Sequence, residues 1–125
     1  MGGKVVRRYL ADAHRYDRGR GWSRVADLPR PVVAAPSPAM ADASGLSVFG
    51  GDDGSQVGGA PEKHRGFDEN IFRFNLKTGS WTIHGESPAP RATVPLTRRG
   101  SSWVIPSGEV RPGVRSPEVW SFSPR

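Results

Sequence analysis

The sequence contains no cysteine, and this absence excludes several kinds of chemistry. Without thiols, the chain cannot form a disulfide, a thiolate metal site or a cysteine nucleophile. Hydrophobic residues make up only 35% of the 125 residues, which is low for a chain with a large core of its own. No apolar run approaches the roughly 20 residues that a membrane-spanning helix needs, so we expect no contact with a membrane.

The N-terminus also lacks a recognisable targeting segment. The first ten residues, MGGKVVRRYL, do not form a secretory signal peptide, because their apolar stretch is too short. The localisation therefore stays open. A periplasmic or secreted protein is expected if a signal peptide precedes this segment in a longer gene product.

Acidic residues are scarce relative to basic ones. The chain has 12 Asp and Glu against 18 Lys and Arg, a net charge of +6. The basic residues are scattered rather than gathered on one helix, so we interpret them as a solvated surface and expect no nucleic-acid partner. The three histidines (14, 64 and 84) lack the close spacing of a metal site, and we expect neither a metal nor another cofactor.

Glycine and proline, in contrast, are abundant. The chain has 16 Gly and 12 Pro, and they alternate with short aromatic and aliphatic runs. This pattern is typical of an all-β chain with many turns. We expect order for most of residues 9–122, with strands at 37–42, 46–50, 69–75, 80–84, 92–97, 102–106 and 117–122.

A set of features recurs along the chain in a constant order. Each copy has a glycine pair, a strand that ends in an aromatic residue and Asp or Asn, a Gly–Trp pair or a Trp near Gly, and a proline loop. Trp22 and Trp81 mark equivalent points of the first two copies, and Gly51 and Gly108 mark those of the second and third. The segments that carry the pattern are YLADAHRYD (9–17), LPRP (28–31), SVFGG (47–51), IFRFN (71–75) and SPAPR (87–91), with WVIPSG (103–108) and VWSF (119–122) as a partial third copy.

A long period with four short strands per unit is typical of β-propeller blades, and kelch repeats run to roughly 50 residues. On these motifs the chain resembles the kelch family. The resemblance implies an all-β, kelch-type β-propeller that is incomplete, with about two and a half four-stranded blades. We predict the end of one blade at 1–33, one complete blade at 34–91 and the start of the next at 92–125, and we interpret the chain as a fragment of a longer protein. Trp22 and Trp81 are expected to fill space between blades.

The segment SGEVRPGVRSPEVW (107–120) carries a second resemblance. It is similar to the loop after a blade's second strand in N-acetylneuraminate epimerases, which are six-bladed kelch propellers. The resemblance implies that Glu109 is the proton acceptor and that Arg115 is its partner at the site. It also implies mutarotation of a sialic-acid-like sugar by acid/base ring opening and closure, with an acidic sugar as the ligand.

The topology of a blade gathers charged residues independently of that resemblance. Loops between the second and third strands share one rim with the connections between blades, and long rim loops are natural places for a site. The loops 50–67 and 108–117 and the link 87–92 then become neighbours. We assign three residues at this rim to substrate binding: His64, Arg91 and Arg111.

The chemistry of ring opening suits these side chains. A carboxylate such as Glu109 can accept the proton of the anomeric hydroxyl, and a guanidinium such as Arg115 can bind the sugar's carboxylate with two parallel hydrogen bonds. Two alternatives stay open. Glu109 and Arg115 could form an ion pair that only rigidifies the loop, or the chain could be a non-catalytic kelch module that binds glycans or protein partners. Open blade edges are also expected to allow self-association.

Overall fold

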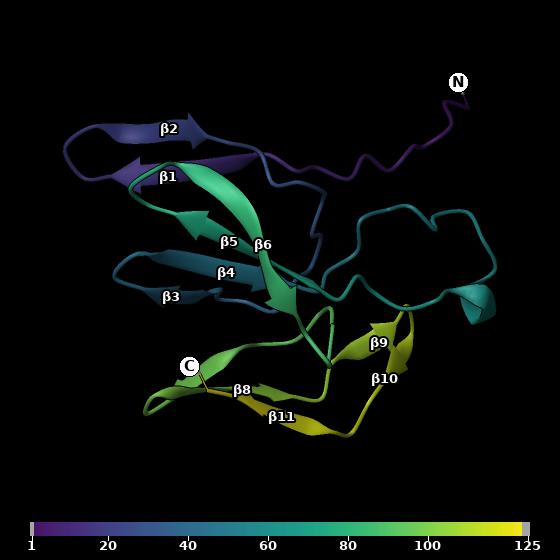
Figure 1. The fold of residues 1–125 in the computed structure, drawn as a ribbon. Coiled ribbons are helices and arrows are strands. Elements are labelled where there is room, and N and C mark those ends of the chain that lie inside the picture. Colours follow the sequence, from purple (N-terminus) through teal and green to yellow (C-terminus); the bar gives the residue numbers. More distant parts are fainter. Residues whose placement is uncertain (1, 124–125) are drawn as a thin grey trace.

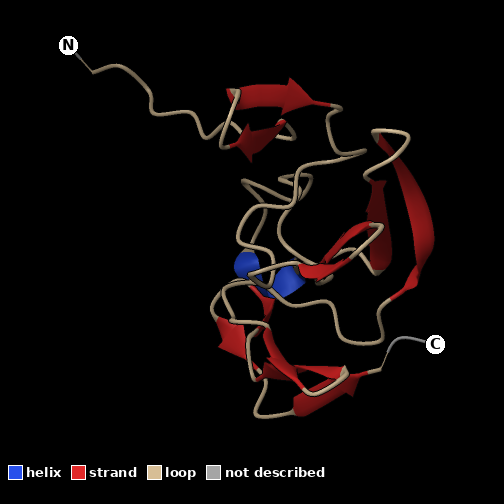
Figure 2. Ribbon diagram, turned by 90° about the vertical axis from the view of Figure 1, so that its left-hand side faces the viewer, coloured by secondary structure: helices blue, strands red, loops and turns tan. Residues whose placement is uncertain are grey.

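The computed structural model describes residues 2–123, and their regular secondary structure is almost entirely β (Figures 1 and 2). The strands are short and belong to four separate antiparallel sheets. The described part of the chain contains one turn of 3-10 helix, η1 (Pro61–Lys63), and no helix long and apolar enough to cross a bilayer.

The central sheet contains four strands that follow one another in sequence and in space. These are β3 (Met40–Asp42), β4 (Gly45–Phe49), β5 (Asn70–Asn75) and β6 (Ser80–Glu86). The turn between β5 and β6 is tight because the side-chain oxygen of Asn75 accepts the backbone N–H groups of Lys77 and Thr78. Gly79 completes this turn with a φ of 68°, a left-handed conformation that favours glycine. An antiparallel meander of four strands is the unit of a propeller blade.

Two smaller sheets flank the central one, one on each side (Figure 1). The hairpin of β1 (Ala13–Asp17) and β2 (Gly21–Val25) lies on the N-terminal side. On the other side, β7 (Thr97–Arg99), β8 (Ser102–Pro106) and β11 (Val119–Phe122) form a sheet in the order β11–β8–β7. The fourth sheet is a miniature hairpin of β9 (Glu109–Arg111) and β10 (Val114–Arg115), inside the loop between β8 and β11.

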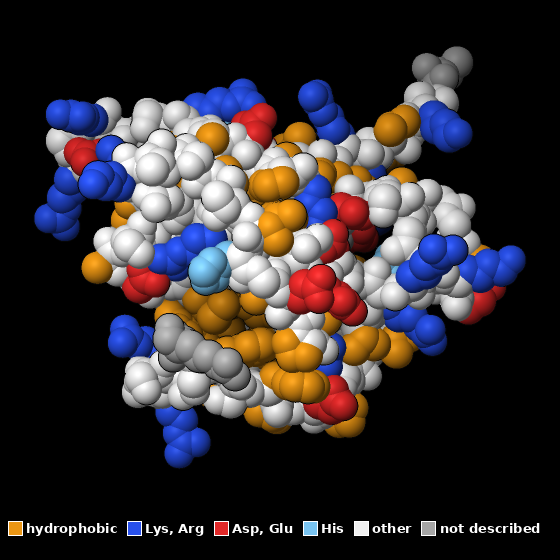
Figure 3. Space-filling model, viewed as in Figure 1, with side chains coloured by type: hydrophobic (Ala, Val, Ile, Leu, Met, Phe, Trp, Pro, Cys, Tyr) orange, Lys and Arg blue, Asp and Glu red, His pale blue; other side chains and the backbone are white. Residues whose placement is uncertain are grey.

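The hydrophobic core lies between the central sheet and the β11–β8–β7 sheet. Its buried members are Phe49, Val94, Leu96 and Ile105, and the rings of Phe49 and Phe122 lie 5.4 Å apart. Complete burial of such a side chain contributes about 1.5–3 kcal/mol, so these contacts contribute strongly to holding the two sheets together. An apolar hollow, whose wall includes Met40, Ile71, His84 and Trp103, remains open on the surface between the sheets (Figure 3).

The two repeated tryptophans differ in their surroundings. Trp81 on β6 packs against Phe74, with ring centres 5.0 Å apart, and its indole N–H donates a hydrogen bond of 2.8 Å to the carbonyl of Ala26. It therefore joins the central sheet to the segment after β2, as expected. Trp22 is 72% exposed and contacts Tyr16 on its own hairpin. The prediction that it fills space between blades is wrong here, because no described strand packs against its side of the hairpin.

Two predicted strands are wrong in their extent. The strand expected at 37–42 begins only at Met40, and the strand expected at 92–97 begins only at Thr97. The preceding residues form isolated bridges, such as Ser37 with Pro95, instead of ladders. Proline lacks an N–H and interrupts a ladder, which explains the difference at 36, 38 and 95. The β9–β10 hairpin was expected only as a loop.

Candidate functional site

Two acidic residues, Asp52 and Glu109, are held by the same backbone pairing in successive repeats. Asp52 exchanges two hydrogen bonds of 2.8 and 2.9 Å with Val33, and Glu109 exchanges two of 2.9 and 3.0 Å with Ala92. Each pair ties the loop after a second strand to the link between neighbouring sheets. Asp52 and Glu109 therefore occupy equivalent positions of the repeat, at one rim of the molecule.

The residues that follow the two bridge partners are conformationally strained. Ala34 and Thr93 have φ angles of 57° and 55°, in the left-handed region that residues with a side chain rarely adopt. The N–H of Thr93 donates a hydrogen bond of 2.8 Å to the carbonyl of Ala34, which joins the two bridges. Such strained positions cluster at functional sites. The two bridges and their links form one continuous backbone unit.

The glycine pair before Asp52 allows a close backbone contact at this rim. Gly50 and Gly51 have φ angles of 67° and 72°. A Cβ on Gly50 would overlap the carbonyl oxygen of Arg91, and one on Gly51 would lie 2.7 Å from the backbone of Val32. The N–H of Gly51 donates a hydrogen bond of 2.9 Å to that Arg91 carbonyl. Glycine is therefore required for the loop to meet the links of both neighbouring sheets.

A cavity of about 410 Å³ lies over the paired bridges. Its wall includes residues of both bridges, the loop between β4 and β5, and the N-terminal segment around Tyr9. Its lining residues with a titratable or hydroxyl-bearing side chain are Arg7, Tyr9, Asp52, His64, Thr93 and Glu109. The structure thus brings together two of the predicted site residues, His64 and Glu109, from loops that belong to successive repeats of the sequence.

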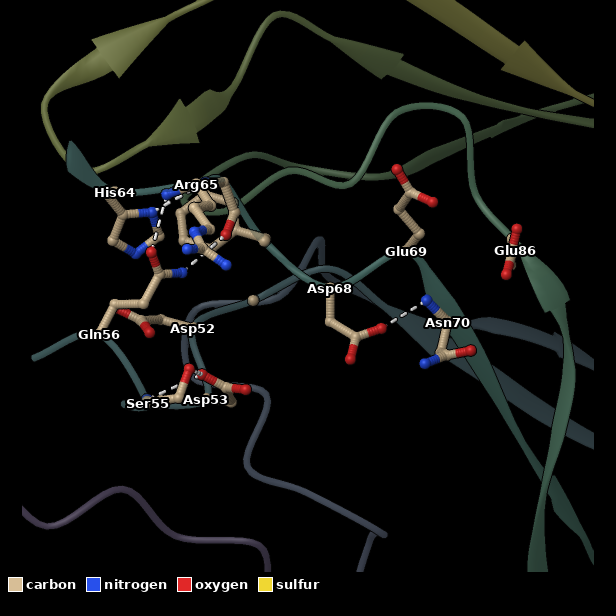
Figure 4. A pocket seen from close by; sticks show the side chains of 13 residues that line it. Asp52, Asp53, Ser55, Gln56, His64, Arg65, Asp68, Glu69, Asn70 and Glu86 are labelled. Atoms are coloured by element: carbon tan, nitrogen blue, oxygen red, sulfur yellow. Dashed lines mark hydrogen bonds between the residues drawn. The ribbon is translucent and has the colours of Figure 1, made fainter. Parts of the chain in front are cut away.

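His64 follows η1 and is oriented by its neighbours (Figure 4). Its Nδ1 accepts the backbone N–H of Gly66 at 3.0 Å, and its ring meets that of Phe67 edge to face, 5.5 Å between centres. Gly66 in turn lies against β9, since a Cβ added there would be 3.2 Å from the carbonyl oxygen of Val110. This contact places the loop that carries His64 on the strand that begins with Glu109.

A second cleft, of about 370 Å³, adjoins the first and is strongly acidic (Figure 4). Burial would raise the pKa of Asp53 in this cleft, but hydrogen bonds from the hydroxyl and N–H of Ser55 outweigh it and lower the pKa. Within residues 2–123, no three or more His, Asp or Glu side chains are grouped so as to hold a metal ion. An acidic sugar would be repelled by this cleft. Its carboxylates belong to Asp52, Asp53, Asp68, Glu69 and Glu86.

The three predicted arginines do not line the first cavity. Arg91 is only 4% exposed, and its Nη2 lies 2.9 Å from the carboxylate of Glu118. A hydrogen bond from the indole of Trp120 and the charge of Arg91 lower the pKa of Glu118. The Nε–H groups of Arg91 and Arg111 are buried without an acceptor among the described residues. The roles of Arg91 and Arg111 in substrate binding stay predictions.

Arg115 lies opposite Glu109 across the β9–β10 hairpin, yet the two side chains do not pair. They are cross-strand partners in the register. The guanidinium of Arg115 instead donates a hydrogen bond of 3.2 Å to the carbonyl of Thr93. Within the described part of the chain, neither Glu109 nor Arg115 takes part in a salt bridge. The loop-rigidifying ion pair considered from the sequence is therefore absent.

Sequence reasoning missed the equivalence of Asp52 and Glu109 and the special conformation of Thr93. A signal for both was present. In each repeat the acidic residue directly follows a glycine that lies just after a strand: Gly51 precedes Asp52, and Gly108 precedes Glu109. The number of residues from Ala34 to Thr93 also equals the number from Trp22 to Trp81. Aligning the copies residue by residue would have paired the two carboxylates.

Comparisons with known proteins agree with this architecture. No protein-family model and no curated protein matches the sequence, whereas 78 chains of solved structures match the fold. One of them is the structure of YjhT, with a TM-score of 0.72 and 18% sequence identity. The match covers 90% of this chain and 40% of YjhT, so the chain spans less than half the length of that structure. The predicted all-β fold is confirmed: the described residues form an incomplete β-propeller of the kelch type.

Proposed function

We propose that the protein catalyses mutarotation of a sialic-acid-like sugar by acid/base opening and closure of the sugar ring. One observation carries the proposal. Glu109 is held on the cavity wall by two backbone hydrogen bonds and takes part in no salt bridge within residues 2–123. A carboxylate that is not engaged with a cation is available to accept the proton of an anomeric hydroxyl.

The size of the cavity and the net charge of the whole protein support an acidic sugar as the ligand. A cavity of about 410 Å³ falls within the usual range for small-molecule sites. The net charge of +6 favours the approach of an anion. Arg115 does not line the cavity, but it is exposed and donates one N–H group to the carbonyl of Thr93, which does line it. Its other N–H groups are therefore available for a sugar carboxylate at the edge of the cavity.

The likeness of residues 107–120 to the epimerase loop supports the same reaction. The propeller fold adds only a compatible scaffold, since kelch propellers serve many unrelated functions. Two kinds of support favour Glu109 and Arg115: the likeness of their loop to the epimerase loop, and their local geometry. The chemistry proposed for them therefore depends on the site and not on the fold.

The direct test measures exchange between the anomers of N-acetylneuraminate by proton NMR, with and without the protein. We expect the wild-type protein to accelerate the exchange. Glu109→Gln keeps the side-chain shape but cannot accept a proton, so it is expected to lower the catalysed rate by about 10²–10⁴-fold.

Glu62→Gln is the matched control, because Glu62 lies exposed on η1 in the neighbouring loop and lines no part of the cavity. This variant should exchange the anomers as fast as the wild type. A folded wild-type protein that leaves the exchange rate unchanged would refute the proposal and favour the non-catalytic kelch module. So would a Glu109→Gln variant with the full rate.

A further inference from the structure

We infer that His64 is a second catalytic residue, a neutral hydrogen-bond donor to the sugar's ring oxygen as the ring opens. The inference rests on the proposed mutarotation and assigns to His64 a more specific role than substrate binding. A base removes the proton of the anomeric hydroxyl but does not stabilise the ring oxygen. That oxygen gains negative charge when its bond to the anomeric carbon breaks. A donor at that oxygen stabilises the charge.

The hydrogen bonds of His64 determine which of its nitrogens carries the proton. Its Nδ1 accepts the backbone N–H of Gly66 at 3.0 Å. A nitrogen that accepts an N–H cannot itself hold a proton, so the imidazole is the neutral tautomer with its proton on Nε2. Among the described residues, no acceptor takes a hydrogen bond from Nε2. The Nε2–H group is therefore available to a ligand.

The position of the ring relative to Glu109 suits this role. Both side chains line the same cavity, and the Gly66–Val110 contact holds the His64 loop against β9. Phe67, only 9% exposed, meets the imidazole edge to face and restricts its rotation. Figure 4 shows His64 beside the β9–β10 hairpin. A sugar in the cavity would have the carboxylate and the imidazole within its reach.

The step balances without any further reactant. Glu109 takes the proton of the anomeric hydroxyl, whose oxygen forms the carbonyl double bond. The bond between the anomeric carbon and the ring oxygen breaks, and its electron pair stays on that oxygen, where the Nε2–H of His64 stabilises it. The protonated Glu109 then returns its proton to the ring oxygen. Closure on the opposite face of the carbonyl reverses these transfers and gives the other anomer.

Two amide substitutions separate this role from a merely structural one. In His64→Gln the side-chain amide nitrogen can occupy the place of Nε2 and donate, whereas in His64→Asn the side-chain oxygen can occupy the place of Nδ1 and accept from Gly66. We expect His64→Gln to preserve most of the anomer exchange. His64→Asn and His64→Leu should lower the exchange rate by about 10²–10³-fold, the usual cost of one lost donor.

His84→Leu is the control, since His84 lies exposed on β6 and lines the apolar hollow rather than this cavity. It should not alter the exchange rate. If His64→Asn is active and His64→Gln is not, the histidine serves only the loop, and the inference is overturned. Full activity of His64→Leu would overturn it as well, while leaving the proposed reaction intact. No exchange by the wild-type protein would overturn the proposed reaction itself, and this inference with it.

Discussion

At the scale of single residues, the site depends on positions where only a small side chain fits. Gly50 has a left-handed φ, and it also faces the Arg91 carbonyl so closely that a methyl group would overlap it. That carbonyl cannot retreat easily, because it accepts the N–H of Gly51. Gly79 has nearly the same φ, 68° against 67°, but has open space around it. Substitution of each glycine by alanine therefore distinguishes the cost of the left-handed conformation from the cost of the steric overlap.

Gly50→Ala is therefore expected to destabilise the protein more than Gly79→Ala does. The left-handed conformation alone costs an alanine about 1–2 kcal/mol, which is the loss expected at Gly79. At Gly50 the overlap with the Arg91 backbone adds to that loss. Urea unfolding of both variants measures the difference in the free energy of unfolding. Equal losses would show that the close approach is not a constraint.

The sequence predicted where the acid and the histidine lie better than where the arginines lie, and the roles of all these residues stay predictions. Glu109 and His64 line one cavity, as the rim argument led us to expect. Arg91 stood out because the equivalent residue of the first copy is Val32, so the repeat itself does not require arginine. In the structure its guanidinium pairs with Glu118. Such a partner depends on how a long side chain turns within the fold, and no spacing pattern contains that information.

At the scale of the elements, strands in which apolar and polar residues alternate clearly were predictable from the sequence. β5 has Phe72 and Phe74 buried on one face, and its extent, like those of β4, β6 and β8, lies within two residues of the prediction. β9 and β10 were not predictable, because strands of three and two residues carry no periodicity. Glu109 at the start of β9 also pairs with Ala92, a tertiary contact that no local sequence pattern contains.

The β3–β4 turn depends on a charged pair that should respond to acid. Arg73 on β5 donates to both carboxylate oxygens of Asp42 at 2.7 and 2.8 Å. This hydrogen bonding, followed by that from the N–H and hydroxyl of Ser44, holds the pKa of Asp42 well below its usual range. A depressed pKa in the folded state means that the pair stabilises the protein above the unfolded pKa, near 4, and less as the pH falls.

We therefore expect the urea midpoint of the wild-type protein to fall as the pH is lowered from about 5 to 3, with Asp42 responsible for part of the fall. Asp42→Asn should be less stable than the wild type at pH 6 and should approach it at pH 3. The measurement is the urea midpoint at each pH. A constant difference between the two proteins across this range would show that the charge of Asp42 does not contribute.

At the scale of the whole molecule, the candidate site is a property of two neighbouring sheets. His64 and Asp52 come from the loop of the central sheet, whereas Thr93 and Glu109 belong to the next repeat. The core of Phe49, Leu96 and Ile105 connects the same two sheets. Packing at this interface and the geometry of the cavity are therefore coupled, and loss of the core would separate the carboxylate from the imidazole.

The outer strands of the molecule offer unpaired edges. β11 is the last strand of its sheet, and β1 pairs only with β2 within residues 2–123. Free strand edges are templates for pairing with another chain. Self-association through these edges therefore stays a prediction, separate from the site, because the cavity lies over the bridges between the sheets.

Titration of the ¹⁵N-labelled protein with N-acetylneuraminate, followed by amide and imidazole NMR, tests most directly whether this cavity is the site of an acidic sugar. We predict saturable shifts at Thr93, Glu109 and the His64 ring, with little change in the β1–β2 hairpin. N-acetylmannosamine, which lacks the carboxylate, should cause weaker shifts. An absence of shifts at the cavity, or shifts confined to the apolar hollow at Trp103, would contradict the assignment of the site.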